Sequence, residues 1–192
     1  MAVNVSNIVV GEATIKVGDS ANATSIVAMD AFGDIGATQN GVEISWEPDM
    51  VDIEIDQFGD AARVIQSKVK VMVKTTLAEA TLNNLALAWN YDSVGTDDVI
   101  ANNDGANTKS FLFGAQTVFP YEKALVITGT APNSSAGGVK TRKFYTKRAI
   151  SMEASNISMK RAEASVFAVG FRILPKVEDT GYEYGKIIDQ TA

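Results

Sequence analysis

Three carboxylates alternate along one short segment, and they are the first side chains to consider for chemistry. Asp52, Glu54 and Asp56 are separated by Ile53 and Ile55. Alternate side chains of a strand point to the same side. A glycosidase-like acid–base pair needs two carboxylates with different pKa values that flank a cleft. Three acids on one strand face repel one another instead, so we interpret them as a charged surface, with a carboxylate-based hydrolase as the less favoured alternative.

The composition removes most other catalytic chemistry. The chain has no histidine and no cysteine. Ser-His-Asp and Cys-His nucleophiles, the usual zinc sites and disulfides are therefore excluded. The fragment 102–105 invites a calcium interpretation, but aligning Gly105 with the invariant glycine of an EF-hand loop puts Ile100 and Phe111 at ligand positions that should be acidic. We expect a protein that is not an enzyme, with no catalytic residue, no metal site and no cofactor.

Charge and hydropathy limit the possible partners. A net charge of −6 and a pI near 4.7 argue against a protein that neutralises nucleic-acid phosphates. Basic residues do surround Phe144 and Tyr145, an arrangement that can bind single strands by base stacking; a solvated strand face or a patch for an acidic neighbour fits the acidic total better. Neither a leader pattern nor an apolar run of spanning length occurs, so we expect cytoplasmic synthesis and no membrane partner. The basic residues are Lys140, Arg142, Lys143, Lys147 and Arg148.

The segments that carry the three acids and the lysines near them are predicted to be strands. Apolar and polar residues alternate over 42–47 and 51–56, with a break at Pro48, and again over 68–74. Lys68, Lys70 and Lys74 lie on the polar face of this last segment. If the two strands pair antiparallel, Lys68 and Lys70 can face Glu54 and Asp52, each pair contributing about 0.2–1 kcal/mol.

A helix is predicted over residues 77–89. Thr76 and Glu79 have the spacing of a capping box, in which the side chain of each residue accepts a hydrogen bond from the free backbone N–H of the other. Behind it, apolar residues recur every three or four positions and form one stripe. The stripe can pack on the sheet of its own domain or at a subunit boundary, and the first interpretation is favoured because amphipathic helices normally cover sheets. The stripe consists of Ala78, Leu82, Leu85, Ala86 and Trp89.

The remaining segments complete an all-β pattern. A first strand is predicted over 8–17 and a second, shorter one over 25–32, and Asn40-Gly41 suits a tight turn with positive φ. Further strands are predicted over 124–130 and over 161–174, and Pro175 ends the last one because proline cannot donate to a ladder. A long polar loop covers 90–110, and the C-terminal arm 176–192 is apolar enough to dock on its own domain or a neighbour. We predict one domain, 1–192, an antiparallel β-sandwich or barrel with one flanking helix and long loops or arms.

Several of these segments resemble the major tail tube proteins of tailed bacteriophages. The resemblance lies in Gly41-Val42, in Asp-Ile-Glu-Ile-Asp-Gln from Asp52, in the run 75–86, and in the closing strand and tail around Pro175. It covers about half of the chain and leaves 92–138 unmatched. It implies a β-sandwich or barrel protomer with a flanking helix that closes into hexameric rings. Stacked rings would form the tube through which DNA is ejected.

The resemblance also implies a location and partners. The chain would be a structural virion protein of the tail, made in the host cytoplasm, and would contact other tail proteins such as a sheath, tape measure, baseplate or terminator. DNA would pass without specific binding through a lumen that tends to be negatively charged in this family. We predict that Asp52, Glu54 and Asp56 line the lumen, although Lys68, Lys70 and Lys74 would make it striped if their strand also faced it. The rival hypothesis is a monomeric β-sandwich binding or adhesive module that holds a ligand with its loops.

Overall fold

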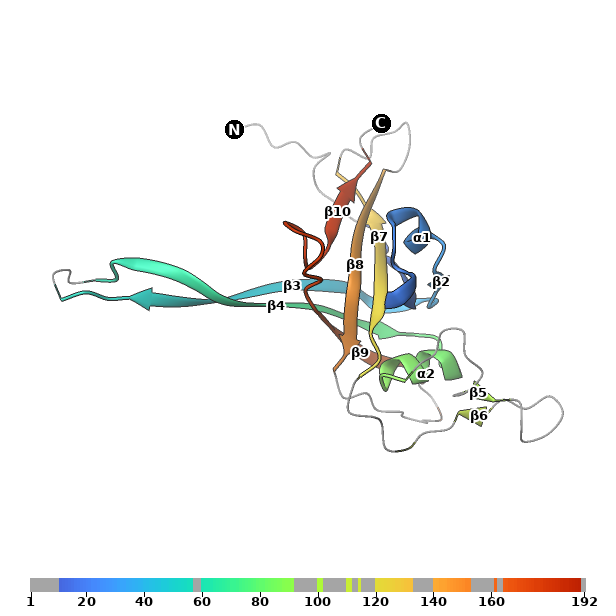
Figure 1. Ribbon diagram of the computed structural model, residues 1–192. Coiled ribbons are helices and arrows are strands. Elements are labelled where there is room, and N and C mark those ends of the chain that lie inside the picture. Colours follow the sequence, from blue (N-terminus) through green and yellow to red (C-terminus); the bar gives the residue numbers. More distant parts are fainter. Residues whose placement is uncertain are drawn as a thin grey trace.

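The computed structural model describes residues 11–56, 60–91, 100–101, 110–111, 114, 120–132, 140–152, 161 and 164–190. Over these residues the protein is mainly antiparallel β-sheet with two short α-helices, which confirms the all-β prediction (Figure 1). The strands are β1 Thr14–Asp19, β2 Gly33–Asp34, β3 Thr38–Ile53, β4 Arg63–Leu77, β5 Ile100–Ala101, β6 Ser110–Phe111, β7 Lys123–Thr130, β8 Thr141–Ser151, β9 Phe167–Ile173 and β10 Lys186–Asp189, and the helices are the 3-10 turn Ser20–Asn22, α1 Ile26–Asp30 and α2 Leu82–Ala88.

One continuous sheet contains most of these strands, in the order β2-β1-β7-β8-β9-β4-β3. The sheet branches at β8, whose first half pairs with β10 and whose last residues pair with β9. The short strands β5 and β6 form a separate ribbon. The sheet bends strongly, so that β3 and β4 run across the direction of β7 and β8 (Figure 1). The described strands therefore form one bent sheet with a side ribbon.

The core lies on one face of this sheet. Alternate residues of β1, β4, β7 and β9 point to it, because successive side chains of a strand point to opposite faces. Phe171 of β9 is completely buried at this face, opposite Val73 of β4. A smaller cluster around Met29 fills the other face, where α1 packs against β7 and β8. Each face of the sheet body thus has its own helix.

The segment predicted as a second strand, 25–32, contains α1 instead. Ser25 is the N-cap, and its Oγ accepts a hydrogen bond from the Ala28 amide at 3.2 Å. Met29 is buried under the helix, and its last residue, Asp30, is bound by Lys143 and Tyr145 of β8. The short apolar run fits either a strand or a helix, and the serine cap together with these tertiary contacts selects the helix.

The second helix is shorter than predicted. It begins at Leu82 with Thr81 as its N-cap, so the predicted capping box of Thr76 and Glu79 is wrong. Thr76 still belongs to β4, where it pairs with Ala168 of β9, and Glu79 accepts a hydrogen bond from the Ala37 amide at 3.0 Å. The ladder with β9 continues through the residues that a local cap would have used, and tertiary pairing overrides the local signal.

The predicted apolar stripe packs on the protein's own sheet in its helical part. Leu85 is buried in the main core, and Leu82 and Trp89 are half-buried against it. Ala78 is also half-buried but precedes the helix. The interpretation of the stripe as a core element is thereby supported.

The C-terminal segment docks on its own domain where it is described, because β10 pairs with β8 from Arg142 to Tyr145. The positive φ predicted for Asn40 and Gly41 is present, at 65° and 76°, but the two residues form a bulge inside β3 and not a turn between strands. Most of the polar loop 90–110, including the fragment 102–105 considered for calcium, lies outside the described residues.

Candidate functional site

A projecting β-ribbon is the most unusual feature of the described structure. β4 pairs with β9 only from Val71 to Leu77, whereas it pairs with β3 along its whole length. Residues 47–53 of β3 and 63–70 of β4 therefore form a two-stranded ribbon, which we call the arm. At about 3.4 Å per residue the arm extends roughly 25 Å beyond the sheet. Figure 1 shows it projecting away from every other element.

The arm is built on a single uninterrupted strand. The alternation that breaks at Pro48 belongs to one strand, because β3 runs through the proline and is 16 residues long. β3 is the last strand of the sheet order, and proline is tolerated at such an edge because its missing N–H is not needed for a ladder there. A long outer edge of this kind presents backbone donors and acceptors to other chains.

The predicted pairing of charges on the arm is correct in kind but wrong in register. Lys70 lies opposite Glu47, with Nζ 3.3 Å from Oε2, and Lys68 lies opposite Asp49. Asp52 lies opposite Val64, and β3 ends at Ile53, so the predicted partners of the lysines are not theirs. The chain turns back sooner than the predicted pairing requires, because Ile53 already lies opposite Arg63. Ser67 is in addition an extra residue on β4 that shifts the register between Asp49 and Met50.

The three acids proposed for the lumen do not share one strand face. Asp52 is in β3, whereas Glu54 and Asp56 follow the end of the strand. All three are exposed near the far end of the arm, and they lie away from the sheet body (Figure 1). The structure thus brings them to one region without forming a shared strand face.

The part of the hairpin nearest the body has one charged and one apolar face. The charged face carries acids on β3 beside lysines on β4, and the Lys70–Glu47 pair is half-exposed, so its contribution to stability is at most about 1 kcal/mol. Lys74 lies opposite Glu43 at its inner end. The charged face consists of Glu43, Glu47, Asp49, Lys68, Lys70 and Lys74.

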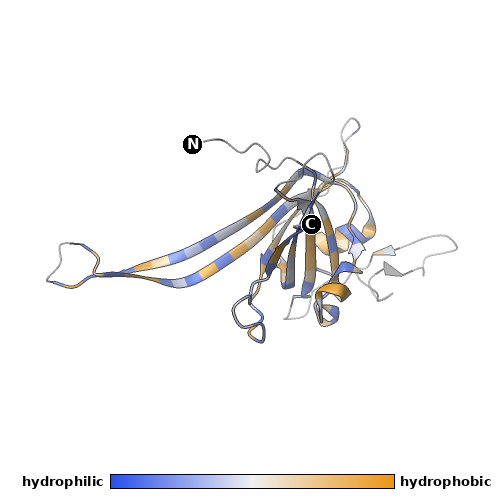
Figure 2. Cartoon of the chain, turned by 90° about the horizontal axis from the view of Figure 1, so that it is seen from above, coloured by the Kyte–Doolittle hydropathy of each residue, from blue (hydrophilic) through white to orange (hydrophobic). Residues whose placement is uncertain are grey.

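The opposite face continues the core outward. Val71 and Val73 are buried, while Ile44 and Trp46, directly opposite them on β3, are 42% and 58% exposed. The Trp46 ring contacts only the edge of Tyr184 among the described rings, with centroids 5.8 Å apart. Figure 2 shows the resulting alternation of polar and apolar residues along both strands. An indole left this exposed beside other apolar side chains is typical of an interaction surface.

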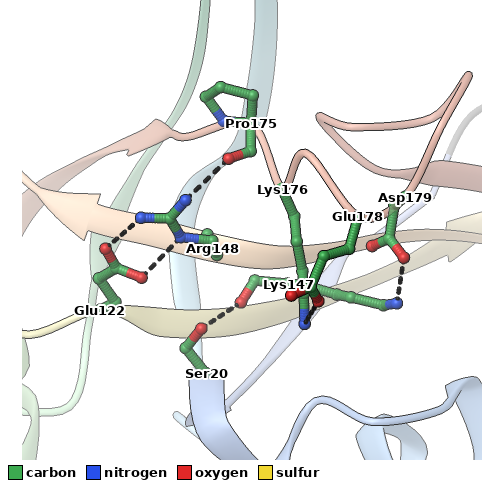
Figure 3. A network of polar contacts seen from close by, with 8 residues as sticks. All are labelled: Ser20, Glu122, Lys147, Arg148, Pro175, Lys176, Glu178 and Asp179. Atoms are coloured by element: carbon green, nitrogen blue, oxygen red, sulfur yellow. Dashed lines mark hydrogen bonds and ion pairs between the residues drawn. The ribbon is translucent and has the colours of Figure 1, made fainter.

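Four of the five basic residues around Phe144 and Tyr145 are paired with acids of the same chain. Arg148 donates two hydrogen bonds to Glu122, at 2.7 and 2.6 Å, and a third to the Pro175 carbonyl at 2.9 Å (Figure 3). Lys147 binds Asp179 at 2.9 Å in the same network. The hydrogen bonds from Arg148 outweigh the effect of burial and lower the pKa of Glu122.

Two further pairs complete this pattern. Arg142 binds Asp189 of β10, and Lys143 binds Asp30 of α1 at 2.9 Å. Burial would raise the pKa of Asp30, but hydrogen bonds from Lys143 and Tyr145 outweigh it and lower the pKa. Four cations of β8 thus fasten α1, β10 and the C-terminal segment to the sheet. They do not form a surface of unpaired charge for nucleic-acid phosphates.

One cavity of the described structure is lined by both polar and apolar side chains. It holds about 260 Å³ between α1 and the C-terminal segment, with Met29, Tyr145 and Tyr182 among its lining residues. Its Asp179 is already bound to Lys147. Nowhere in the described ranges do three acidic side chains gather as a metal site would require. Within the same ranges, no helix has the length and apolar character needed to cross a membrane.

Sequence reasoning located the arm's charges but missed its extent and its exposed apolar face. The available signal was the change of phase in the apolar residues, from Ile44 and Trp46 to Val51 and Ile53, within what proves to be one strand. The sequence matches no protein-family model and no curated protein.

Proposed function

We propose that this chain is a structural, self-assembling protein whose copies form stacked hexameric rings, the tube of a phage-like tail that conducts DNA during ejection. The observation that carries this proposal is the arm: a projecting ribbon with exposed apolar side chains and an outer edge, along β3, that pairs with no other described strand. The resemblance of the hairpin and the closing strand to tail tube proteins supplies the specific assembly. The site of action would be the virion tail, after synthesis in a host cytoplasm.

The energetics of the arm favour a partner. An isolated two-stranded ribbon is marginally stable in water, and this one holds five apolar side chains that are 38–56% exposed. Burying the rest of these side chains would contribute on the order of 5 kcal/mol per arm, before the entropy costs of association. The five residues are Met50, Val51, Ile53, Val64 and Ile65.

Repetition of one contact would produce the ring. The arm projects from one side of the body, so its docking partner is a different surface of the next copy, and such a head-to-tail contact closes into a ring when the rotation fits. A second set of contacts would then stack the rings. Further tail proteins, among them a possible sheath, tape measure, baseplate and terminator, would bind at the ends or outside. DNA would slide through the lumen without specific binding, with Asp52, Glu54 and Asp56 as candidate lumen residues.

Sedimentation velocity over a concentration series tests the proposal. Wild-type protein should shift from monomer to large discrete species as its concentration rises. The matched control replaces residues 50–67 by Asn-Gly, which joins the paired residues Asp49 and Lys68 with a two-residue turn and leaves the core untouched. This variant should fold and remain monomeric. A wild-type protein that stays monomeric at every concentration would support the binding-module alternative instead.

A further inference from the structure

The distal part of the arm, residues 50–53 and 63–66, has apolar side chains on both of its sides. Met50 and Val64 point to the side of Trp46, because residues two apart on a strand share a side and paired residues point the same way. Val51 and Ile65, which pair with each other, point to the opposite side. That opposite side is the continuation of the charged face. The proximal part, in contrast, is apolar on one side only.

The bulge at Ser67 decides on which side of the distal arm each residue of β4 lies. Without the extra residue, Gln66 would lie on the side of Val51, and Ile65 on the side of Met50. Ser67 Oγ donates a hydrogen bond to the Asp49 carbonyl at 3.3 Å, which ties the bulge to the partner strand. The bulge therefore keeps Ile65 beside Val51, on the side of the arm that is charged near the body.

We propose that the apolar side chains on both sides of the distal arm are covered by neighbouring copies of this chain, whereas Asp52 at its end and the charged face near the body stay open to water in the assembly. This inference rests on the proposed function and specifies its contact. A ribbon with apolar residues on both sides loses water from both only if it is inserted between two surfaces. The charged face has three acids and three lysines, and burying these six would cost more than their exposed pairs return.

A second copy is the occupant that the described residues favour. The arm cannot fold back on its own sheet, because it points away from the body in both views (Figures 1 and 2). The body itself carries exposed apolar side chains away from the arm, at Val27 of α1, Val177, Tyr182 and Ile187. One copy thus offers both an apolar ribbon and exposed apolar side chains on its body. A lipid surface fits poorly, because the arm ends in acids, among them Asp52, Glu54 and Asp60.

Thiol labelling tests the proposal on a chain that has no cysteine of its own. Three single variants place a cysteine on each side of the distal arm and on the charged face: Val64→Cys, Val51→Cys and Glu47→Cys. Each is mixed in trace amount into excess wild-type protein, so that the variant does not limit assembly. Maleimide labelling rates are then compared below and above the assembly concentration. If Val64→Cys does not co-assemble, Met50→Cys takes its place on the same side of the arm. Ile65→Cys takes the place of Val51→Cys in the same way.

Assembly should slow labelling of the cysteines at positions 64 and 51 by about tenfold or more, because covered thiols react only after local opening. The cysteine at position 47 should react at nearly the same rate in both states. The inference that both sides are covered would be wrong if assembly protected the cysteine at only one of positions 64 and 51 from labelling, protected neither, or protected position 47 equally. The proposed assembly itself would not be contradicted by these results. Absence of any assembly in the wild-type protein would overturn the proposed function and this inference together.

Discussion

Leu85 offers a direct test of whether α2 belongs to the core or to a subunit boundary. The residue is 8% exposed and lies in the main hydrophobic cluster with Phe167 and Phe171 of β9. Leu85→Asp removes a buried leucine, a loss of about 2–5 kcal/mol when the residue is truncated to alanine. It also places a carboxylate in an apolar site without a partner, which adds further cost. The sum approaches the whole stability of an ordinary domain, about 5–15 kcal/mol.

A matched variant on the same helix separates charge from burial. Asn83 is exposed in the first turn of α2, so Asn83→Asp introduces the same carboxylate into water near the helix N-terminus, where a negative charge is tolerated or slightly favourable. Its free energy of unfolding should stay within about 0.5 kcal/mol of the wild-type value.

Urea unfolding followed by circular dichroism, at concentrations where the protein is monomeric, measures both variants. Leu85→Asp should lose its cooperative transition or shift it to far lower urea, and Asn83→Asp should not. A Leu85→Asp protein that unfolds like the wild type but no longer assembles would refute the assignment of α2 to the core. It would place the helix at a subunit boundary instead.

Three further predictions concern the contacts that fasten the C-terminal half. Arg148→Lys keeps the charge but loses the two-point contact with Glu122 and the bond to Pro175, so it should lower the free energy of unfolding by about 1 kcal/mol in urea titrations, more than Lys140→Arg as a control; an equal effect would contradict the network. The pKa values of the Asp30 and Glu122 carboxyls are lowered in the folded protein, so these carboxylates stabilise the fold at pH values above their ordinary pKa values of 3.8 and 4.5, and this stabilisation is lost as the pH falls below them. The melting temperature of Asp30→Asn should therefore decline less than that of the wild type between about pH 5 and 2. Parallel curves of melting temperature against pH would contradict this. Gly185 has φ +142° and a Cβ there would collide with the Tyr145 carbonyl, so Gly185→Ala should destabilise β10 more than Gly181→Ala, which has φ +87° and open space; hydrogen exchange at 186–189 measures the difference, and equal exchange would count against the contact.

The fold class could be predicted from the alternation of residues, but the boundaries that depend on distant partners could not. The all-β prediction rests on a period of two that burial enforces along β4 and β9. The predicted start of α2 was wrong because Thr76 and Leu77 pair with β9, a contact that the local spacing of residues does not reveal. The prediction of a strand where α1 lies was wrong for a related reason. A short apolar run fits a strand as well as a helix, and the partner of Asp30, Lys143 of β8, is distant from it in the sequence.

The candidate surface was predictable in its charges and not in its shape. The acids and lysines of the hairpin were recognised as opposed rows, and Glu47 with Lys70 confirms that principle. Their partners could not be assigned, because the turn length and the extra residue Ser67 set the register. Nor does the sequence show that the ladder with β9 stops at Val71 and leaves the rest of the hairpin beside no further strand among those the structure describes.

Negative-stain electron microscopy of the purified wild-type protein at high concentration tests the central claim most directly. We predict rings with a central hole, or tubes of stacked rings, and sixfold symmetry in class averages. Uniform monomeric particles at every concentration, or irregular aggregates without a hole, would contradict a tube-forming subunit.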